Sequence, residues 1–424
     1  MTDNLLNRKF TGLTDYLLPL AAALIICRAF PSLSFFYYLV PIIFLLALGL
    51  NLYLNHNLIK TEKNLRLLLS LILLFSGWAC ITALWSPFPA TSISRAAYFL
   101  LIAVSSVMLG YNWSKEEKND LFGYLLPANL IVVITCIYSL ITSYPADSWT
   151  GGHGLGFKGF ASHQNTLASA LVFTLPAVLF PVLREIIRKT VGRSHNRSDS
   201  VRLSPAKFII FSVLLAANII LLLESVSRAG VLTVIIILLA FSLLNFKVRT
   251  TLVYLLLAFV SFAILFYSSQ AVRHFVFKTE NKIGDRRIIN IHETIDAAKN
   301  GGLLGLGYGI SQEPKDKRVI GHFENEGKIF VREKMIGVLA LIEEVGIIGL
   351  SIFLGIIGIG FWGRKRMDRF AKFSFTEDRI SSIMILAVMI GYCFHAQIEA
   401  WWVGVGSIQL PLFFMILGQG VKRV

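Results

Sequence analysis

The sequence has 424 residues, of which 55% are hydrophobic and only 15% are charged, and its mean hydropathy is +0.68. Because a soluble domain carries about 25% charged residues, this composition excludes an ordinary soluble protein and indicates apolar helices in a membrane. The net charge of +15 comes from basic residues scattered over many loops rather than gathered on one face, which argues against nucleic-acid binding.

Apolar runs of about 20 residues are long enough to cross a hydrocarbon core as helices. About twelve such runs are predicted, at 13–31, 35–54, 67–86, 94–111, 121–143, 164–183, 208–225, 229–246, 250–268, 338–361, 380–397 and 404–420. We therefore expect an all-α integral membrane protein in which residues 1–424 form a single polytopic domain. A long polar loop, 269–337, separates the ninth span from the tenth and is expected to contain short amphipathic helices.

The distribution of basic residues predicts the orientation, because lysine and arginine are enriched in cytoplasmic loops. With twelve spans, every strongly basic loop falls on one side, including 184–207 with its seven lysines and arginines, and so do both termini. The short segments around Pro31, Pro87 and Pro145 are poor in basic residues. Both termini are therefore predicted to be cytoplasmic, and the loop 269–337 extracytoplasmic.

The potential metal ligands show no metal-site pattern. The four cysteines lie in apolar spans without metal-ligand spacing, so neither a metal site nor a disulfide is expected from them. The His, Asp and Glu residues form no cluster with metal-site spacing either, and we predict a metal-independent protein without a cofactor. No internal repeat relates the two halves of the chain, which argues against many twelve-span transporter folds.

In chain order, the first charged residues of interest lie where the predicted span 208–225 ends. Arg228 follows Glu224 by four residues, so the two would share one face and pair if the helix continued. A charge at the edge of a span is costly and usually functional, and arginine can hold a phosphate bidentately. The alternative is an arginine that reaches the lipid headgroups and anchors the helix end.

The long loop carries a second pair of arginines, Arg286 and Arg287. They precede a pattern that predicts an amphipathic helix lying on the membrane or covering a cavity, with an apolar stripe of Ile288, Ile291, Ile295 and Ala298. The glycine-rich segment 301–309 does not follow a strand and precede a helix, so it is no dinucleotide-binding fingerprint. We interpret it as a tight apolar turn where the backbone approaches the membrane.

Acidic and aromatic residues mark the last predicted spans. Glu343 and Glu344 stand together at the outer start of the tenth span, where Glu344 is expected to cap or position the loop and Glu343 to face water. His395 and Glu399 lie beside the tryptophan pair at 401–402. We interpret that group as part of an interfacial aromatic belt.

Several short motifs follow one another in a characteristic order. They are Trp85-Ser86-Pro87, the segment 159–168 (GFASHQNTLA), Ser227-Arg228-Ala229-Gly230, Arg287 ahead of Gly305-Leu306-Gly307-Tyr308-Gly309, and Leu339 with Glu344, Gly346, Gly349 and Leu350. Each is weak alone. As an ordered set around one long loop they resemble the O-antigen ligase and O-antigen polymerase superfamily of bacterial membrane glycosyltransferases, from about the third span to the twelfth.

The resemblance implies transfer or polymerisation of glycan from an undecaprenyl-diphosphate-linked donor to an acceptor hydroxyl, which belongs to a further glycan or to lipid A–core. The reaction would take place at the periplasmic face of the bacterial inner membrane, with the loop 269–337 over a cavity open to the outer leaflet. Arg228 and Arg287, with Arg286, would hold the diphosphate. Three further residues are expected to bind substrate: Asn165, His163 and Lys334.

The sequence departs from the ligase pattern at one position. Ligases of this superfamily carry His followed by Asn about eleven residues before the glycine that matches Gly346, where this chain has Met335 and Ile336. Some polymerase-like relatives have Glu-Lys in this stretch, and Glu333-Lys334 resembles them. The departure favours a polymerase, but ligase and polymerase both stay open.

A general base is still needed to deprotonate the acceptor, and such a base is worth about 10²–10⁴-fold. Glu333 is the first candidate, with His322 and Glu344 as further catalytic candidates. The competing class is a lipid-linked oligosaccharide flippase or another polysaccharide-export transporter, and a third is a scaffold in an export complex.

Overall fold

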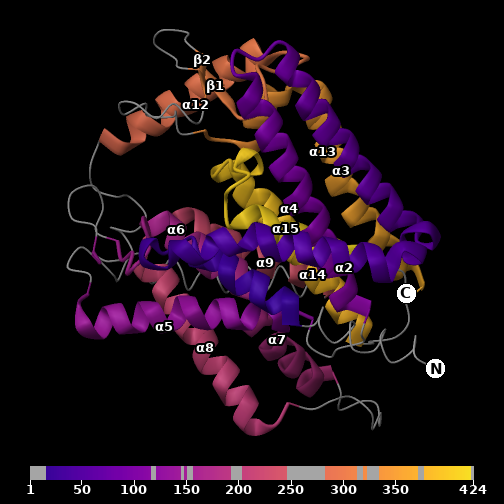
Figure 1. Cartoon of the computed structure of the whole chain (residues 1–424). Coiled ribbons are helices and arrows are strands. Elements are labelled where there is room, and N and C mark those ends of the chain that lie inside the picture. The colour runs from indigo at the N-terminus through magenta and orange to yellow at the C-terminus, as the bar shows by residue number, and fades with distance from the viewer. Residues whose placement is uncertain are drawn as a thin grey trace. The chain divides into compact units, whose positions relative to one another are not determined.

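The computed structural model describes residues 16–115, 121–144, 148–149, 156–191, 203–245, 282–312, 319–321, 334–370 and 377–421. These residues are mostly helical (Figure 1). The chain divides into two compact units. Unit 1 comprises Met1–Ile43, Asn112–Thr279 and Arg366–Tyr392, and unit 2 comprises Phe44–Tyr111, Glu280–Lys365 and Cys393–Val424.

The regular elements of unit 1 in its described part are helices. They are the helix Tyr16–Cys27, η1 (Pro31–Leu39), η3 (Gly123–Leu125), α5 (Leu126–Thr142), α6 (Gln164–Thr174), α7 (Pro176–Val191), α8 (Pro205–Glu224), α9 (Arg228–Asn245) and most of α14 (Glu377–Ile398).

Unit 2 combines helices with one short antiparallel ribbon. Its elements are most of α2 (Val40–Thr61), α3 (Lys63–Ile81), η2 (Thr82–Leu84), α4 (Pro89–Lys115), α12 (Lys282–Gly301), β1 (Ile310–Gln312), β2 (Val319–Gly321), α13 (Gly337–Phe370), η5 (Trp401–Val403) and α15 (Gln409–Gly420). The ribbon pairs Ile310 with Gly321 and Gln312 with Val319. This ribbon is a small departure from the predicted all-α class.

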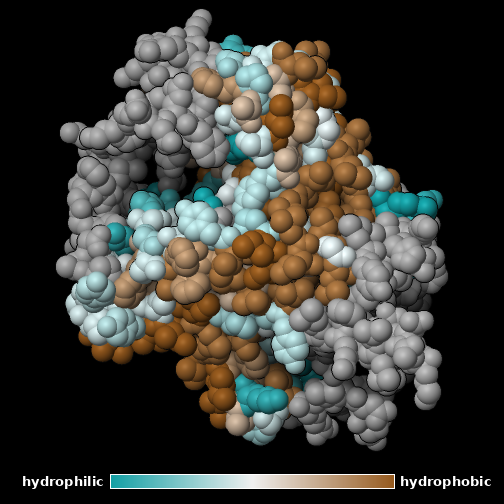
Figure 2. All heavy atoms as spheres, viewed as in Figure 1, coloured by the Kyte–Doolittle hydropathy of each residue, from teal (hydrophilic) through white to brown (hydrophobic). Residues whose placement is uncertain are grey.

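Eight described helices are long and apolar enough to cross a membrane, or nine if the bent pair α6 and α7 is counted as one span. The predicted span 338–361, for example, corresponds to Gly337–Phe361. The chain is therefore a multi-pass helical membrane protein. Its exposed helix surfaces agree with this, because large apolar side chains such as Leu46 and Val213 are 62% exposed. Figure 2 shows such apolar side chains over much of one face.

Four of the twelve predicted spans do not match a single long helix in the described structure. The span 164–183 is the bent pair α6 and α7. The span 13–31 contains only the shorter helix Tyr16–Cys27, and the span 404–420 contains the 12-residue helix α15. The span 250–268 lies outside the described residues.

The break between α6 and α7 in unit 1 is caused by a proline. Pro176 has no backbone N–H, so the carbonyl of Val172 loses its helical partner, and the two helices meet at a bend of 43°. Tyr392 of α14 fills this gap, because its hydroxyl donates to the Phe173 carbonyl at 3.0 Å and lies 3.4 Å from the Val172 carbonyl. The Tyr392 ring also stacks on Phe173, with centroids 3.9 Å apart.

A buried polar cluster joins three helices of unit 1. The Asn129 amide of α5 donates to Asn218 of α8 at 2.8 Å and to Thr174 of α6 at 3.0 Å, and Asn218 donates back to Asn129 at 3.1 Å. All three side chains are buried. Side-chain hydrogen bonds of this kind hold membrane helices together where no hydrophobic effect does.

The predicted amphipathic helix of the long loop is confirmed as α12, which begins at Lys282 and ends at Gly301. Its buried face is displaced from the predicted stripe. Ala298 is buried as expected, but its buried neighbours are Thr294 and Ala297, while Ile291 and Ile295 are only partly covered.

Candidate functional site at the break in α13

The helix α13 of unit 2 is interrupted at Gly346, which has φ 72° and ψ −178°. Only glycine adopts this backbone conformation without strain. The surroundings also require glycine, because a Cβ at position 346 would collide with the carbonyl of Leu303. This interruption is the point at which the glycine-rich segment 301–309 meets the helix.

The backbone groups released by the break are paired with the glycine-rich segment. The carbonyls of Glu343 and Glu344 accept from the N–H groups of Leu306 at 2.8 Å and Gly307 at 3.0 Å. Beyond the break, the N–H groups of Ile347 and Ile348 donate to the carbonyls of Gly302 at 3.1 Å and Leu303 at 3.3 Å. The segment is a tight turn as predicted, and the partner of its backbone is a broken helix.

The end of α3 supports both sides of this arrangement. Trp78 donates from Nε1 to the Val345 carbonyl at 2.7 Å, and Trp85 donates from Nε1 to the Gly305 carbonyl at 2.9 Å. Thr82 lies between them in sequence, and its hydroxyl accepts from the Tyr308 N–H at 3.1 Å. Three residues separated by less than three helical turns therefore hold the turn and the break in register.

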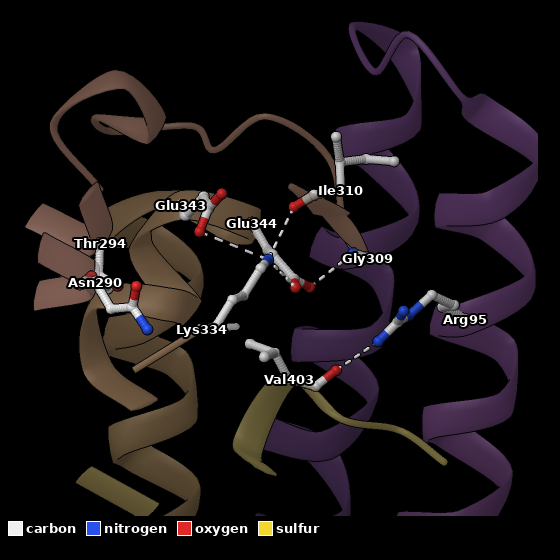
Figure 3. Close-up of polar contacts among 9 residues, drawn as sticks. All are labelled: Arg95, Asn290, Thr294, Gly309, Ile310, Lys334, Glu343, Glu344 and Val403. Atoms are coloured by element: carbon white, nitrogen blue, oxygen red, sulfur yellow. Dashed lines mark hydrogen bonds and ion pairs between the residues drawn. The ribbon is translucent and has the colours of Figure 1, made fainter. Parts of the chain in front are cut away.

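A buried ion cluster lies on the polar side of the same turn (Figure 3). The Lys334 ammonium lies 2.5 Å from Glu344 Oε1 and 3.6 Å from Glu343 Oε2, and it donates to the Ile310 carbonyl at 2.9 Å. The other carboxylate oxygen of Glu344 accepts from the Gly309 N–H at 2.6 Å. Lys334, just before α13, is thereby connected to both β1 and the broken helix.

These charged side chains are removed from solvent. The side chains of Glu343, Glu344 and Lys334 are 0%, 1% and 7% exposed. The expectation that Glu343 faces water is therefore wrong, because the turn and the segment at Lys334 cover it. Removing one member of such a cluster leaves an uncompensated charge in a poorly solvated place, which costs about 3–5 kcal/mol.

Arg95 was not singled out from the sequence, although it lies just inside the predicted span 94–111. In α4 it is 8% exposed, and its Nη2 donates to the Val403 carbonyl at 2.6 Å. Its guanidinium carbon lies 5.8 Å from the centre of the Tyr308 ring. Figure 3 shows Arg95 and Glu344 on opposite sides of Gly309.

The remaining predicted site residues of unit 2 are only partly described. Arg286 and Arg287 lie in the first turns of α12, where the structure describes the backbone. Glu333 and His322 lie outside the described residues. Met335, at the position of the ligase histidine, directly follows the cluster residue Lys334.

The predicted site residues of unit 1 lie at helix starts. His163 caps α6, because its Nδ1 accepts from the Asn165 N–H at 3.1 Å. Arg228 is the first residue of α9. The helix does not continue from Glu224 to Arg228, which was the condition for the two to share one face, because α8 ends at Glu224 and the chain turns through Val226, whose φ is 53°.

The tryptophan pair at 401–402 also differs from its prediction. The two residues are 4% and 3% exposed and pack against protein, with Trp402 beside Phe353 at 5.3 Å between ring centroids. Trp401 donates from its indole nitrogen to His395 Nδ1 at 3.1 Å. An interfacial belt facing the headgroups is therefore the wrong interpretation, since these rings form part of the core of unit 2.

Among the described residues, no group of three or more His, Cys, Asp or Glu side chains is placed to hold a metal ion. A comparison with models of known protein families gives no match, and a comparison with curated proteins gives no significant match.

Proposed function

We propose that this chain is a metal-independent membrane glycosyltransferase that takes glycan from an undecaprenyl-diphosphate-linked donor to an acceptor hydroxyl, as an O-antigen or surface-polysaccharide polymerase or ligase. The observation that carries the proposal is the contact between motifs that are distant in sequence. Trp85, the glycine-rich turn, Glu344 and Gly346 all belong to the set that resembles the ligase and polymerase superfamily, and they contact one another at the break in α13.

The motifs of unit 1 support the proposal in the same way. A Cβ added at Gly230, in the motif that contains Arg228, would lie 3.1 Å from the Cβ of Ala168, in the motif 159–168. The two motifs are about sixty residues apart in sequence, so local composition does not explain their contact. In each unit, motif residues that are distant in sequence are therefore in contact.

The proposed chemistry is a substitution at the anomeric carbon of the donor sugar. The bond from that carbon to the acceptor oxygen forms, the bond to the diphosphate oxygen breaks, and undecaprenyl diphosphate leaves as an anion. Arg228, Arg286 and Arg287 would stabilise the departing negative charge, which is a large contribution in a poorly solvated site. The acceptor proton would pass to a general base.

The contacts of Glu344 bear on the choice of that base. Both of its carboxylate oxygens are already occupied, one by Lys334 and the other by the Gly309 N–H. We therefore propose that Glu344 holds the turn and that Glu333 takes the proton. Lys334 would act through Glu344 rather than by contacting substrate.

The test uses purified protein in detergent without divalent metal. It is supplied with an undecaprenyl-diphosphate oligosaccharide, alone or with lipid A–core, and the lipid products are resolved by mass. A series of lengthened lipid-linked glycans, formed when only the donor is supplied, identifies a polymerase. A product that forms only when lipid A–core is present identifies a ligase. Arg228→Ala and Arg287→Ala should each lower the rate by about 10²–10³-fold, and Glu333→Gln by about 10²–10⁴-fold.

The matched control is Lys299→Ala. Lys299 lies on α12 like Arg287, is 71% exposed and pairs with the exposed Asp296. Normal turnover by Arg228→Ala and Arg287→Ala, in folded protein, would exclude the proposed role of these arginines.

A lipid-linked oligosaccharide flippase is the second candidate, and the interrupted helices favour it. Transporters place substrate sites at discontinuous helices, and this chain has one interruption at Pro176 and another at Gly346. The two functions are separated by reconstituting the protein in liposomes with fluorescent lipid-linked oligosaccharide. Accelerated flipping without any new glycosidic bond would favour the flippase.

A further inference from the structure

Arg95 is a buried cation whose hydrogen-bonding capacity is mostly unfilled. A guanidinium has five N–H donors, yet the described structure gives Arg95 one acceptor, the Val403 carbonyl. Its Nε is buried without a partner, and no described carboxylate forms an ion pair with it. A charged side chain within an apolar span is costly, and such residues usually mark functional sites.

Three more buried donors, on segments that contact Arg95, also lack partners within the described part of the chain. They are the Tyr308 hydroxyl, the Ser311 hydroxyl and the indole N–H of Trp402. Tyr308 directly precedes Gly309 and Ser311 follows it by two residues, and a Cβ at Gly309 would collide with the Arg95 side chain. Trp402 precedes Val403, whose carbonyl accepts from Arg95.

The unpartnered side-chain groups around Arg95 are mainly hydrogen-bond donors rather than acceptors. Burial raises the pKa of the Tyr308 phenol although the nearby Arg95 lowers it, so the phenol keeps its proton. An indole nitrogen and a guanidinium can only donate. Glu344 does not complete the set, because in the described structure it bonds to none of these donors and its two oxygens accept from Lys334 and from the Gly309 N–H.

We propose that Arg95, Tyr308, Ser311 and Trp402 form a binding site for an oxyanion, a phosphate or a carboxylate group. Only an anion supplies both the counter-charge that Arg95 lacks and enough lone pairs for several donors. Arginine suits both groups, because its planar fork matches their oxygens bidentately. The site goes beyond the proposed transferase function and does not depend on it.

The test is a calorimetric titration of the purified full-length protein in detergent, with inorganic pyrophosphate in one series and sodium glucuronate in another. Saturable binding of one probe is expected, and its identity distinguishes a phosphate group from a carboxylate group. Arg95→Gln should weaken that binding about tenfold or more, since hydrogen bonds to charged groups are the strong ones. Arg95→Lys keeps the charge without the fork and should bind with intermediate affinity.

Lys299→Gln is the control for loss of one positive charge and should bind like the wild type. If Arg95→Gln fails to fold, Ser311→Ala and Trp402→Phe provide the test, each with an expected weakening of about twofold to tenfold. Arg287→Ala and Arg228→Ala are titrated in parallel, because both arginines are proposed to bind diphosphate.

The inference is overturned if neither probe binds saturably. It is also overturned if binding is lost only in Arg287→Ala or Arg228→Ala while the Arg95, Ser311 and Trp402 variants bind normally. Anion binding that depends on Arg95, in a protein without glycan transfer, would remove the proposed function and leave this site in place.

Discussion

Each unit contains an interrupted apolar helix, and the two interruptions are stabilised differently. In unit 1, Pro176 removes one donor, and a single hydroxyl from Tyr392 covers the exposed carbonyls. In unit 2, the positive φ of Gly346 interrupts the helix and releases groups on both sides, and four backbone hydrogen bonds with the glycine-rich turn and one from Trp78 replace them. The carbonyls released at the proline break are satisfied by one side chain. The backbone groups released at the glycine break are satisfied mainly by a second backbone segment.

The largest effect is expected for Gly346→Ala. Alanine is strained at a φ of 72° with extended ψ, and its Cβ would collide with the Leu303 carbonyl, so we expect a loss of at least about 3 kcal/mol. The measurement is the thermal unfolding midpoint of the purified protein in detergent. Gly358→Ala, in the same helix with open space around it, should leave the midpoint within a few degrees, and an equal effect of the two substitutions would contradict the prediction.

The second prediction concerns the ion cluster that lies beside the glycine break. Lys334→Met removes the cation that pairs with the buried Glu344 and lies 3.6 Å from the buried Glu343, and it should cost about 3–5 kcal/mol. Unfolding by denaturant measures this difference. Lys299→Met removes an exposed pair with Asp296 and should cost less than about 1 kcal/mol, so similar losses would show that the cluster does not stabilise the fold.

Tyr392→Phe addresses the proline break and should cost about 1–2 kcal/mol, because buried carbonyls lose their donor. A double-mutant cycle sharpens the test. Pro176→Ala restores an N–H for the Val172 carbonyl, so Tyr392→Phe should cost less in that background. Tyr138→Phe, at a 54% exposed position, is the control for loss of a hydroxyl, and additive costs of Pro176→Ala and Tyr392→Phe would disprove the assigned role.

The smallest effect is expected for Thr174→Val, next to the proline break. It removes one hydrogen-bond acceptor of Asn129 while the reciprocal bonds between Asn129 and Asn218 remain. Such bonds between membrane helices are worth about 0.6 kcal/mol on average. Thr135→Val is the control, because the Thr135 hydroxyl donates to carbonyls of its own helix, those of Ile131 and Val132. An equal loss in both variants would show that the cluster adds nothing between helices.

The difference between the two breaks also separates what was predictable from what was not. Pro176 lies inside the predicted span 164–183, and a proline there indicates a bend without any tertiary information. Gly346 stands in a run of residues that reads as an ordinary apolar helix. Nothing local distinguishes it from Gly358, which the helix accommodates without interruption, because the distinction comes from the Leu303 backbone beside it.

The candidate site shows the same division. Sequence reasoning singled out Glu344, the glycine-rich turn and Lys334, and the structure brings these together. The sequence led to the wrong expectation that Glu343 faces water, and it did not single out Arg95. Burial depends on which segments pack over a side chain, and the sequence does not show this. The motif order pointed to the right stretches of chain, but the hydrogen bond that connects Trp85 with Gly305 spans 220 positions in sequence.

The sequence by itself determined that this is a multi-pass helical membrane protein, because the length and apolarity of each run are properties of a local segment in lipid. It also determined α12 and the presence of a tight turn. Only the tertiary structure decided that the turn pairs with a broken helix, that three charges are buried beside it, and that Arg95 is buried against Gly309 and Val403. The physical reason is that a released or buried polar group must find a partner, and in a folded chain that partner lies far away in sequence.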